Sequence, residues 1–500
     1  MASGRFEEAL QAVRLAVGTR AVRTGFLGSL LILLGSLSPA YLPQASPVWE
    51  VLYQLRLDGP VSKWAGTVLT LVGLALLLES WLRLRPSRRR AKGLPQLRHW
   101  AVFGVIALPL LLGPPIFSHD AYSYAAQGWM LENGINPYTV GPGVLPGTFA
   151  DQVAWVWRDT PAPYGPLALR MSHWLVVLAG FDPLWSAQLM RIPALVGVAL
   201  IGILVPRIAR LLGVDPYAAS WFAVLNPILV IDFVGGMHND SLMTGLMLLG
   251  IWFTMVFRHW WVGAVIVGVA ASIKQPAFLA AVALPFLVTP WTSWKARPLS
   301  WAITRGFVSL LVSVVVFAGI SVATGLGFGW VNAVNVPGMV DTVSPFSVLG
   351  HAIQYPLDFF GLDPDPDGRT AINVSRAVGI VVCAIGIVWL AVRHLGRRPV
   401  HFVSWSFLLF AFCAPAIHSW YVVWGGVLFP MTRPSRRWLR VAIVITAVLL
   451  GYAAMNFALR NGPWLIGLLL VWALYESVKS HELDQDWDAP APPQASAVRS

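Results

Sequence analysis

Asp120 stands where a long apolar run abruptly ends, and it is the first candidate for chemistry in this sequence. The run covers residues 102–117, and the polar stretch Ser-His-Asp-Ala-Tyr-Ser-Tyr follows at 118–124. A charged side chain within a bilayer segment costs about 2.5–3.5 kcal/mol on insertion scales, so an acid at such a boundary usually has a functional role. The alternative is a carboxylate at a helix end that water simply solvates. We expect a catalytic role for Asp120.

Further side chains with hydroxyl, amide, imidazole, carboxylate or cationic groups cluster at the ends of other apolar runs. If these runs are membrane spans that alternate in direction, the clusters fall on the same side of the membrane as Asp120. Their alternatives are helix capping at 238–240, an aromatic belt at 418–421 and contact with lipid headgroups for Arg158. The candidate binding residues are His119, Tyr122, Tyr124, Gln127, Arg158 and Tyr164 in the first long loop, then His238, Asn239, Asp240, Lys274, Gln275, His418, Trp420, Tyr421 and Arg460.

The composition defines the environment in which these side chains must be positioned. Hydrophobic residues make up 57% of the 500 residues and charged residues only 12%, whereas soluble proteins carry about 25% charge. Apolar runs of helical span length recur without the alternating pattern of a transmembrane barrel. The fold class is therefore an all-α polytopic membrane protein. The net charge of +12 lies in short Lys/Arg blocks between the runs, which orient a membrane protein and do not indicate nucleic acid as a partner.

Apolar run length predicts about fourteen transmembrane helices. The positive-inside rule places both termini in the cytoplasm, because the basic blocks then fall on the inner side. Two long outer loops remain, 118–183 and 324–371, and each is expected to contain an interfacial helix. We expect residues 1–480 to form one integral membrane domain and 481–500 a disordered cytoplasmic tail. The expected spans are 22–42, 64–82, 100–117, 184–205, 216–234, 241–257, 260–273, 276–289, 302–323, 372–393, 402–416, 419–431, 439–458 and 463–478.

The two short apolar runs on either side of Lys274, Gln275 and Pro276 are unusual. A run of about fourteen residues barely crosses a bilayer, and Pro276 cannot continue the hydrogen-bond ladder of a preceding helix. The freed backbone groups must be satisfied in a protein-lined or water-lined cavity. We therefore expect this hairpin to dip into a polar chamber, with Lys274 at its outer tip.

Five motifs carry a family resemblance. They are FSHDAYSYAAQG at 117–128, NPYTVGP at 136–142, RDTPAPYGP at 158–166, NPILVIDFVGGMHND at 226–240 and the hairpin around Lys274. Together they resemble the actinobacterial polyprenyl-phosphomannose-dependent α-1,6-mannosyltransferases, which build the mannan core of lipomannan and lipoarabinomannan. The resemblance covers most of the membrane domain. His119 departs from it, because we expect arginine before the acid in this family.

The resemblance implies a membrane glycosyltransferase of the GT-C type, with its site on the outer face of the plasma membrane. The donor would be polyprenyl-phosphate-mannose, and the acceptor the 6-hydroxyl of a mannan, lipomannan or phosphatidylinositol-mannoside-type glycan. Conversion of a β-linked phosphate into an α-glycoside inverts the anomeric carbon, which requires one base opposite the leaving group. We expect Asp120 to be that base. Binding of the donor phosphate is expected from the cations and the adjacent imidazole, Lys274, Arg158, Arg460 and His119.

No cofactor is expected, although Asp120, His238 and Asp240 are ligand types that suit a divalent cation. The sequence has no phosphate loop, no serine nucleophile elbow and nothing like a nucleotide-sugar domain, which favours a donor reached from the membrane. Two alternative functions remain. One is a polyprenyl-phosphate-dependent transferase of another sugar. The other is a transporter or flippase of lipid-linked sugars, since broken helices and intramembrane charges also mark transport sites.

Overall fold

The computed structural model describes residues 2–38, 40–333, 336–340, 342–364 and 368–481, and these residues contain helices and no strand. The expected disordered tail falls almost wholly on 482–500, outside the described residues. The α-helices are α1 (Ala2–Gly18), α2 (Arg20–Ser36), α3 (Pro47–Gln54), α4 (Pro60–Arg83), α5 (Pro86–Ala91), α6 (His99–Ala107), α7 (Asp120–Glu132), α8 (Thr148–Asp151), α9 (Trp155–Arg158), α10 (Pro166–Leu178), α11 (Pro183–Leu189), α12 (Arg191–Leu211), α13 (Pro216–Ala223), α14 (Asp240–Phe257), α15 (Trp260–Ala271), α16 (Phe278–Ala281), α17 (Leu284–Val288), α18 (Ala296–Ala323), α19 (Pro345–Phe359), α20 (Thr370–Leu390), α21 (Pro399–Cys413), α22 (Ser419–Gly426), α23 (Arg436–Asn461) and α24 (Trp464–Lys479). Shorter 3-10 or π segments are η1 (Leu108–Leu112), η2 (Pro142–Val144), η3 (Leu229–Gly235), η4 (Gln275–Ala277), η5 (Gly329–Ala333), η6 (Val336–Met339), η7 (Ala391–Leu395) and η8 (Phe429–Thr432).

Within the described ranges, six helical segments are long and apolar enough to cross a membrane, and the pair α1 and α2, bent by 79°, is a possible seventh. The chain is therefore a multi-pass helical membrane protein. The six are α4, α11 with α12, α14, α18, α20 with η7, and α23.

The expected count of about fourteen spans is not confirmed, because several apolar runs fold as short or broken helices. The run at 216–234 is one example: α13 ends at Ala223, and the π-helix η3 follows the Asn226-Pro227 step. The hairpin around Lys274 is divided into α15, η4, α16 and α17, in agreement with the break expected at Pro276. The structure thus interrupts the run at 216–234, which the sequence analysis predicted as one span.

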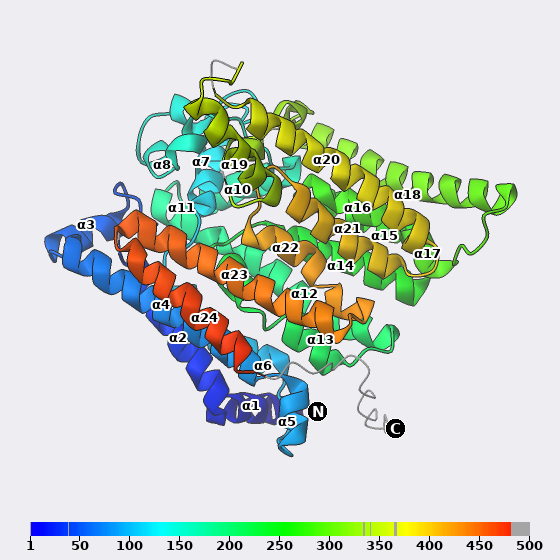
Figure 1. Ribbon diagram of the computed structural model, residues 1–500, viewed down its shortest axis with the longest axis horizontal. Coiled ribbons are helices and arrows are strands. Elements are labelled where there is room, and N and C mark those ends of the chain that lie inside the picture. Colours follow the sequence, from blue (N-terminus) through cyan, green and yellow to red (C-terminus); the bar gives the residue numbers. More distant parts are fainter. Residues whose placement is uncertain (1, 39, 334–335, 341, 365–367, 482–500) are drawn as a thin grey trace.

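The two long loops gather at one end of the molecule. Figure 1 shows α7, α8, α10 and α19 at the top of the picture, whereas α1 and the arginine-rich α5 lie at the opposite end. The segments predicted to be interfacial are helical, as α10 and α19. Helix α7 packs closely on α10 through Gly128, where a Cβ would lie 2.6 Å from the Ser172 carbonyl oxygen. This packing fixes the helix that begins with Asp120.

Candidate active site

Two turns with the same backbone design lead into helices α7 and α14. Phe117 and Met237 have positive φ angles of 65° and 58°, and in each case the aspartate three residues later is the first residue of the helix. This conformation is strained for residues other than glycine and is concentrated at functional sites. The Ile116 amide donates a 3.1 Å hydrogen bond to the Gly235 carbonyl. The two turns, and therefore the two aspartates, are held in one region.

The carboxylate of Asp120 is polar on one side and open on the other. Its Oδ2 accepts hydrogen bonds from the hydroxyls of Tyr124 (3.3 Å) and Tyr164 (3.4 Å). The same oxygen lies 3.3 Å from Nδ1 of His238, an ion-pair distance without the alignment of a hydrogen bond. Within the described part of the chain, Oδ1 has no hydrogen-bond partner. The Asp120 side chain is 15% exposed, so an incoming hydroxyl can reach it.

The surroundings of Asp120 keep it ionised. Burial raises its pKa, but the neighbouring His238 and the charge of Lys274 lower it more, and the net pKa lies below the ordinary value. The pKa values of Tyr124 and Tyr164 are shifted the other way: burial and nearby charged groups raise them well above the usual range. Near neutral pH the carboxylate therefore accepts hydrogen bonds and the two phenols donate them.

A stack of three rings forms the wall behind Asp120. The fully buried ring of His238 lies 3.7 Å from Trp420, centre to centre, and Trp420 lies 4.4 Å from His418 on its other side. Gly236 makes room for this arrangement, because a Cβ there would lie 3.0 Å from the His238 ring. Burial lowers the pKa of His418 to about 4. That ring is therefore neutral near pH 7, and it supplies a flat surface without a charge.

Asp240 is occupied by an ion pair. The ammonium of Lys274 donates to both carboxylate oxygens, at 2.9 and 3.0 Å, and the indole of Trp424 donates to Oδ1 at 2.9 Å. The same ammonium lies 4.8–5.8 Å from the ring centres of Tyr164, Tyr421 and Trp424. Burial lowers the pKa of Lys274, but Asp240 raises it more, so the net pKa is raised. Lys274 is therefore charged, and its ammonium is enclosed by Asp240 and three aromatic rings.

The loop before α10 is docked onto the end of α15. The Gly165 amide donates a 3.0 Å hydrogen bond to the Ile273 carbonyl, and a Cβ at Gly165 would collide with the Ser272 backbone. Only glycine permits this approach. The contact holds Tyr164 beside Lys274, and so it couples the first long loop to the broken hairpin.

A cationic group lies near His119, the residue before Asp120. The guanidinium carbon of Arg460 is 4.8 Å from the ring centre of Tyr41, which is 5.5 Å from the ring of His119. Burial and the charge of Arg460 lower the pKa of His119 to about 4. His119 is therefore neutral near pH 7, and Arg460 supplies the positive charge at this position. Arg460 is exposed and has no carboxylate partner among the described residues.

Arg158 and Gln275 make contacts other than with Asp120. Arg158 donates a 2.9 Å hydrogen bond to Asp151, and both side chains are exposed by more than 40%. Gln275 donates a 3.4 Å hydrogen bond to the Pro163 carbonyl, so it supports the docked loop. Asn239 occupies the N-cap position of α14 without a side-chain capping bond. Five predicted binding residues are buried, each with a polar atom that has no hydrogen-bond partner in the described part of the chain: Tyr122, Gln127, His238, Asn239 and Trp420.

Two residues of the site were missed by the sequence analysis. Trp424 binds Asp240 through its indole, and Tyr41 lies between Arg460 and His119. Trp424 follows Trp420 by four residues, one helical turn, and this spacing could have placed it with the predicted cluster. Tyr41 offers no comparable signal. In the described ranges, no three His, Cys, Asp or Glu side chains are arranged to hold a metal ion.

The fold and the site define a multi-pass helical membrane protein with an ionised, accessible carboxylate at the ends of broken helices. Residues 22–293 match the family described as alpha-(1->6)-mannopyranosyltransferase, N-terminal domain, and residues 359–477 match the MptB C-terminal domain. The chain belongs to the alpha-(1->6)-mannopyranosyltransferase family. It is therefore a mannosyltransferase, as the resemblance in the sequence indicated.

Named relatives agree with the family match. Alpha-(1->6)-mannopyranosyltransferase A of Mycobacterium tuberculosis (strain ATCC 25618 / H37Rv) is 32% identical over 446 residues, which cover 85% of this chain and 83% of the relative. The protein of the same name from Corynebacterium glutamicum is 30% identical over 66% of this chain and 71% of its own length. Alpha-(1->6)-mannopyranosyltransferase B of the same organism is 26% identical over 81% of this chain and 71% of its own length.

Proposed function

We propose that this mannosyltransferase moves mannose from polyprenyl-phosphate-mannose to the 6-hydroxyl of a mannan or phosphatidylinositol-mannoside-type acceptor, with inversion. The observation that carries the proposal is the Oδ1 of Asp120, which has no hydrogen-bond partner among the described residues, on an ionised carboxylate whose other oxygen accepts hydrogen bonds from two tyrosines. A carboxylate held in one orientation with one lone-pair face open is suited to general-base catalysis.

In the proposed reaction, the acceptor O6 forms a bond to the anomeric carbon while its proton passes to Oδ1 of Asp120. The bond between the anomeric carbon and the phosphate oxygen breaks, and the phosphate leaves with the electron pair. Because the phosphate leaves as an anion, it needs a nearby positive charge and not a proton. Attack opposite to the leaving group gives an α-linked product from a β-linked donor.

Arg460 is the cation best suited to the donor phosphate. Lys274 already contacts both oxygens of Asp240 and is only 11% exposed, and Arg158 is paired with Asp151. Arg460 is exposed, and its neighbour His119 adjoins the base directly in sequence. We assign phosphate binding mainly to Arg460, with His119 as a neutral hydrogen-bond donor. Lys274 contributes through its charge, which helps keep Asp120 ionised.

The acceptor sugar has two kinds of contact available near the base. The partly exposed ring of His418, at the end of the stack that it forms with Trp420 and His238, offers a flat face, and the apolar face of a sugar packs well on an aromatic ring. The hydroxyls of Tyr124 and Tyr164 lie at the carboxylate and can also meet sugar hydroxyls. We propose that this wall orients the 6-hydroxyl toward Oδ1.

The site is proposed to face the outside of the plasma membrane, with both termini in the cytoplasm. Support comes from the basic residues of α5, which lie at the end of the molecule opposite α7 and α10 (Figure 1). The positive-inside rule assigns such basic segments to the cytoplasm. A lipid-linked donor then presents its mannose to the site from the outer leaflet.

The donor assignment is tested with the purified full-length protein in detergent. Mannose transfer to a short α-1,6-mannoside is measured with polyprenyl-phosphate-mannose or with a nucleotide-linked mannose as the donor. We expect product only with the lipid-linked donor, with an α-configured new bond. Transfer from the nucleotide-linked donor alone would reject the proposed donor.

A further inference from the structure

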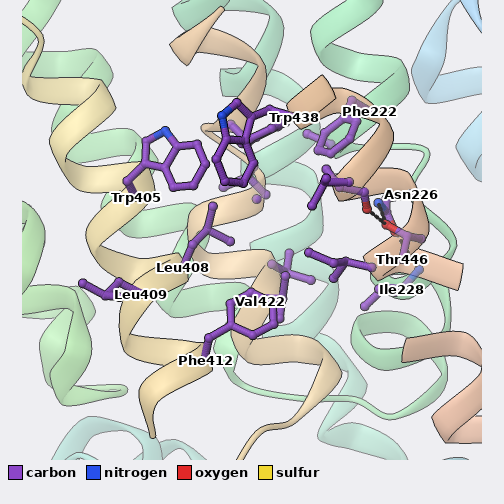
Figure 2. A pocket seen from close by; sticks show the side chains of 18 residues that line it. Phe222, Asn226, Ile228, Trp405, Leu408, Leu409, Phe412, Val422, Trp438 and Thr446 are labelled. Carbon is purple, nitrogen blue, oxygen red and sulfur yellow. Dashed lines mark hydrogen bonds between the residues drawn. The ribbon is translucent and has the colours of Figure 1, made fainter. Parts of the chain in front are cut away.

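An apolar pocket lies between α13, α21, α22 and α23, away from the Asp120 carboxylate. Its volume is about 360 Å³, within the range of about 300–1,000 Å³ typical of ligand pockets. The side chain of Trp438, exposed by 48%, and that of Val441, exposed by 37%, line it, so it opens on the outer surface of the helix bundle. Figure 2 shows Trp405 and Trp438 at one end and Phe412 and Val422 at the other.

The chemistry of the lining suits a hydrocarbon chain. Asn226 and Thr446 hydrogen bond to each other at 3.4 Å (Figure 2), so their polar groups satisfy one another. The other lining residues are apolar or aromatic side chains or glycine. A pocket that opens from a membrane protein's surface with such a lining excludes water and favours an alkyl chain.

Helix α22 separates this pocket from the proposed active site. Trp420, Tyr421 and Trp424 of α22 make the contacts with His238, Lys274 and Asp240 described above. Val422, Val423 and Gly426 of the same helix line the pocket. An occupant of the pocket would therefore pack on the side of α22 that faces away from the proposed active site, without touching the reacting atoms.

One end of the pocket is bordered by tryptophan and histidine rings. The Trp405 ring lies 5.0 Å from Trp438 and 6.0 Å from His401, whose ring is 4.1 Å from His394.

Arginines begin both helices at this end, with Arg398 preceding α21 and Arg436 and Arg437 opening α23. These arginines are exposed and have no carboxylate partner among the described residues. Exposed arginines at the helix starts nearest Trp405 and Trp438 complement a molecule that is anionic at one end and apolar at the other.

We propose that the pocket binds one acyl chain of an anionic phospholipid, with the headgroup phosphate at the basic end formed by Arg398 and Arg437. Basic pockets between transmembrane helices recognise anionic headgroups in this way. Tryptophan rings at the boundary between chain and headgroup fit the same arrangement. The site is independent of the proposed donor site, and the lipid stabilises the wall that carries Trp420 and Trp424.

The test compares phosphatidylglycerol with phosphatidylcholine of identical chains, added to the purified full-length protein in an uncharged detergent. Binding is read by native mass spectrometry and by the shift in thermal unfolding. We expect wild-type protein to bind phosphatidylglycerol more tightly. The double variant Arg398→Gln/Arg437→Gln should bind it about tenfold more weakly, since each basic side chain contributes to anionic-lipid binding.

A pocket-filling variant tests the acyl chain. A Cβ at Gly426 would meet no atom within 4 Å, so Gly426→Leu extends into the pocket without a backbone clash and should abolish the preference for phosphatidylglycerol. Gly319→Leu is the matched control, because a Cβ at this exposed glycine of α18 also meets no atom within 4 Å. Equal binding of the two lipids by wild type, or unchanged phosphatidylglycerol binding in Gly426→Leu, would overturn the proposal. Tighter binding of polyprenyl phosphate, lost in Gly426→Leu, would also overturn it and assign the pocket to the donor.

Discussion

The turns before Asp120 and Asp240 share one backbone design, yet the two carboxylates differ in exposure and in the side chains that contact them. Asp120 is 15% exposed and meets neutral hydroxyls and a histidine, whereas Asp240 has no exposed side-chain surface and meets the ammonium of Lys274. The backbone that presents a carboxylate at the start of a helix therefore does not decide its role. The side chains that pack on the carboxylate decide whether it takes part in chemistry or in structure.

The ion pair between Asp240 and Lys274 also explains how two carboxylates can lie in one region. Two carboxylates in one region repel each other, and a cation beside one of them relieves this repulsion. Lys274 neutralises Asp240 and at the same time contributes to the lowered pKa of Asp120. The sealed ion pair thus helps the open carboxylate to remain ionised. If this division of roles is correct, substitutions at the two aspartates should have different consequences.

The largest expected effect is on activity in Asp120→Asn. Asparagine keeps the shape of the side chain but cannot take the proton of the acceptor hydroxyl. Mannose transfer should fall by about 10²- to 10⁴-fold, the usual contribution of a general base. The initial rate with saturating donor and acceptor measures the effect, and thermal unfolding checks that the variant is folded. Turnover at the wild-type rate would remove Asp120 from the mechanism.

Asp240→Asn should instead act on stability. It leaves the buried Lys274 without its carboxylate, and an uncompensated buried charge typically costs about 3–5 kcal/mol. The variant should unfold at a lower temperature in detergent. The double variant Asp240→Asn/Lys274→Met should recover much of the loss, because both buried charges are then absent. If the single variant is as stable as the wild type, the ion pair does not have the structural role assigned to it.

Part of this contrast could be predicted from the sequence, and part could not. The helical membrane class follows from composition, and Asp120 stands out because it ends an apolar run. The break after Lys274 follows from Pro276. Burial of Asp240 could not be predicted, because it depends on Lys274 and Trp424, which are 34 and 184 residues away in the chain. The span count was not confirmed because apolar content does not reveal where a helix is interrupted.

Arg460 and Arg158 are both exposed, but only Arg158 has a carboxylate partner among the described residues. Arg460→Gln should raise the donor KM by about tenfold, since a charge-assisted hydrogen bond contributes about 1.5–3 kcal/mol. Arg158→Gln is the control: its guanidinium is paired with Asp151 on the surface, and an exposed ion pair contributes little. Steady-state kinetics with varied polyprenyl-phosphate-mannose measure both. Equal effects of the two substitutions would contradict the assignment of the phosphate to Arg460.

The smallest expected effect is a shift in pH dependence, and it tests what keeps Asp120 ionised. The pKa of Asp120 is lowered mainly by His238, against the opposing effect of burial. An ordinary aspartate has a pKa of about 3.9. The acid limb of kcat/KM for the wild-type protein should therefore lie at a lower pH than this value. In His238→Gln the pKa should rise, so the carboxylate should be protonated, and the activity lost, at a higher pH. His418→Gln should shift the limb less, because His418 makes a smaller contribution to lowering this pKa. Rates are normalised to the folded fraction, since His238 is fully buried. An acid limb at the same pH in wild type and His238→Gln would show that this histidine does not set the protonation of the base.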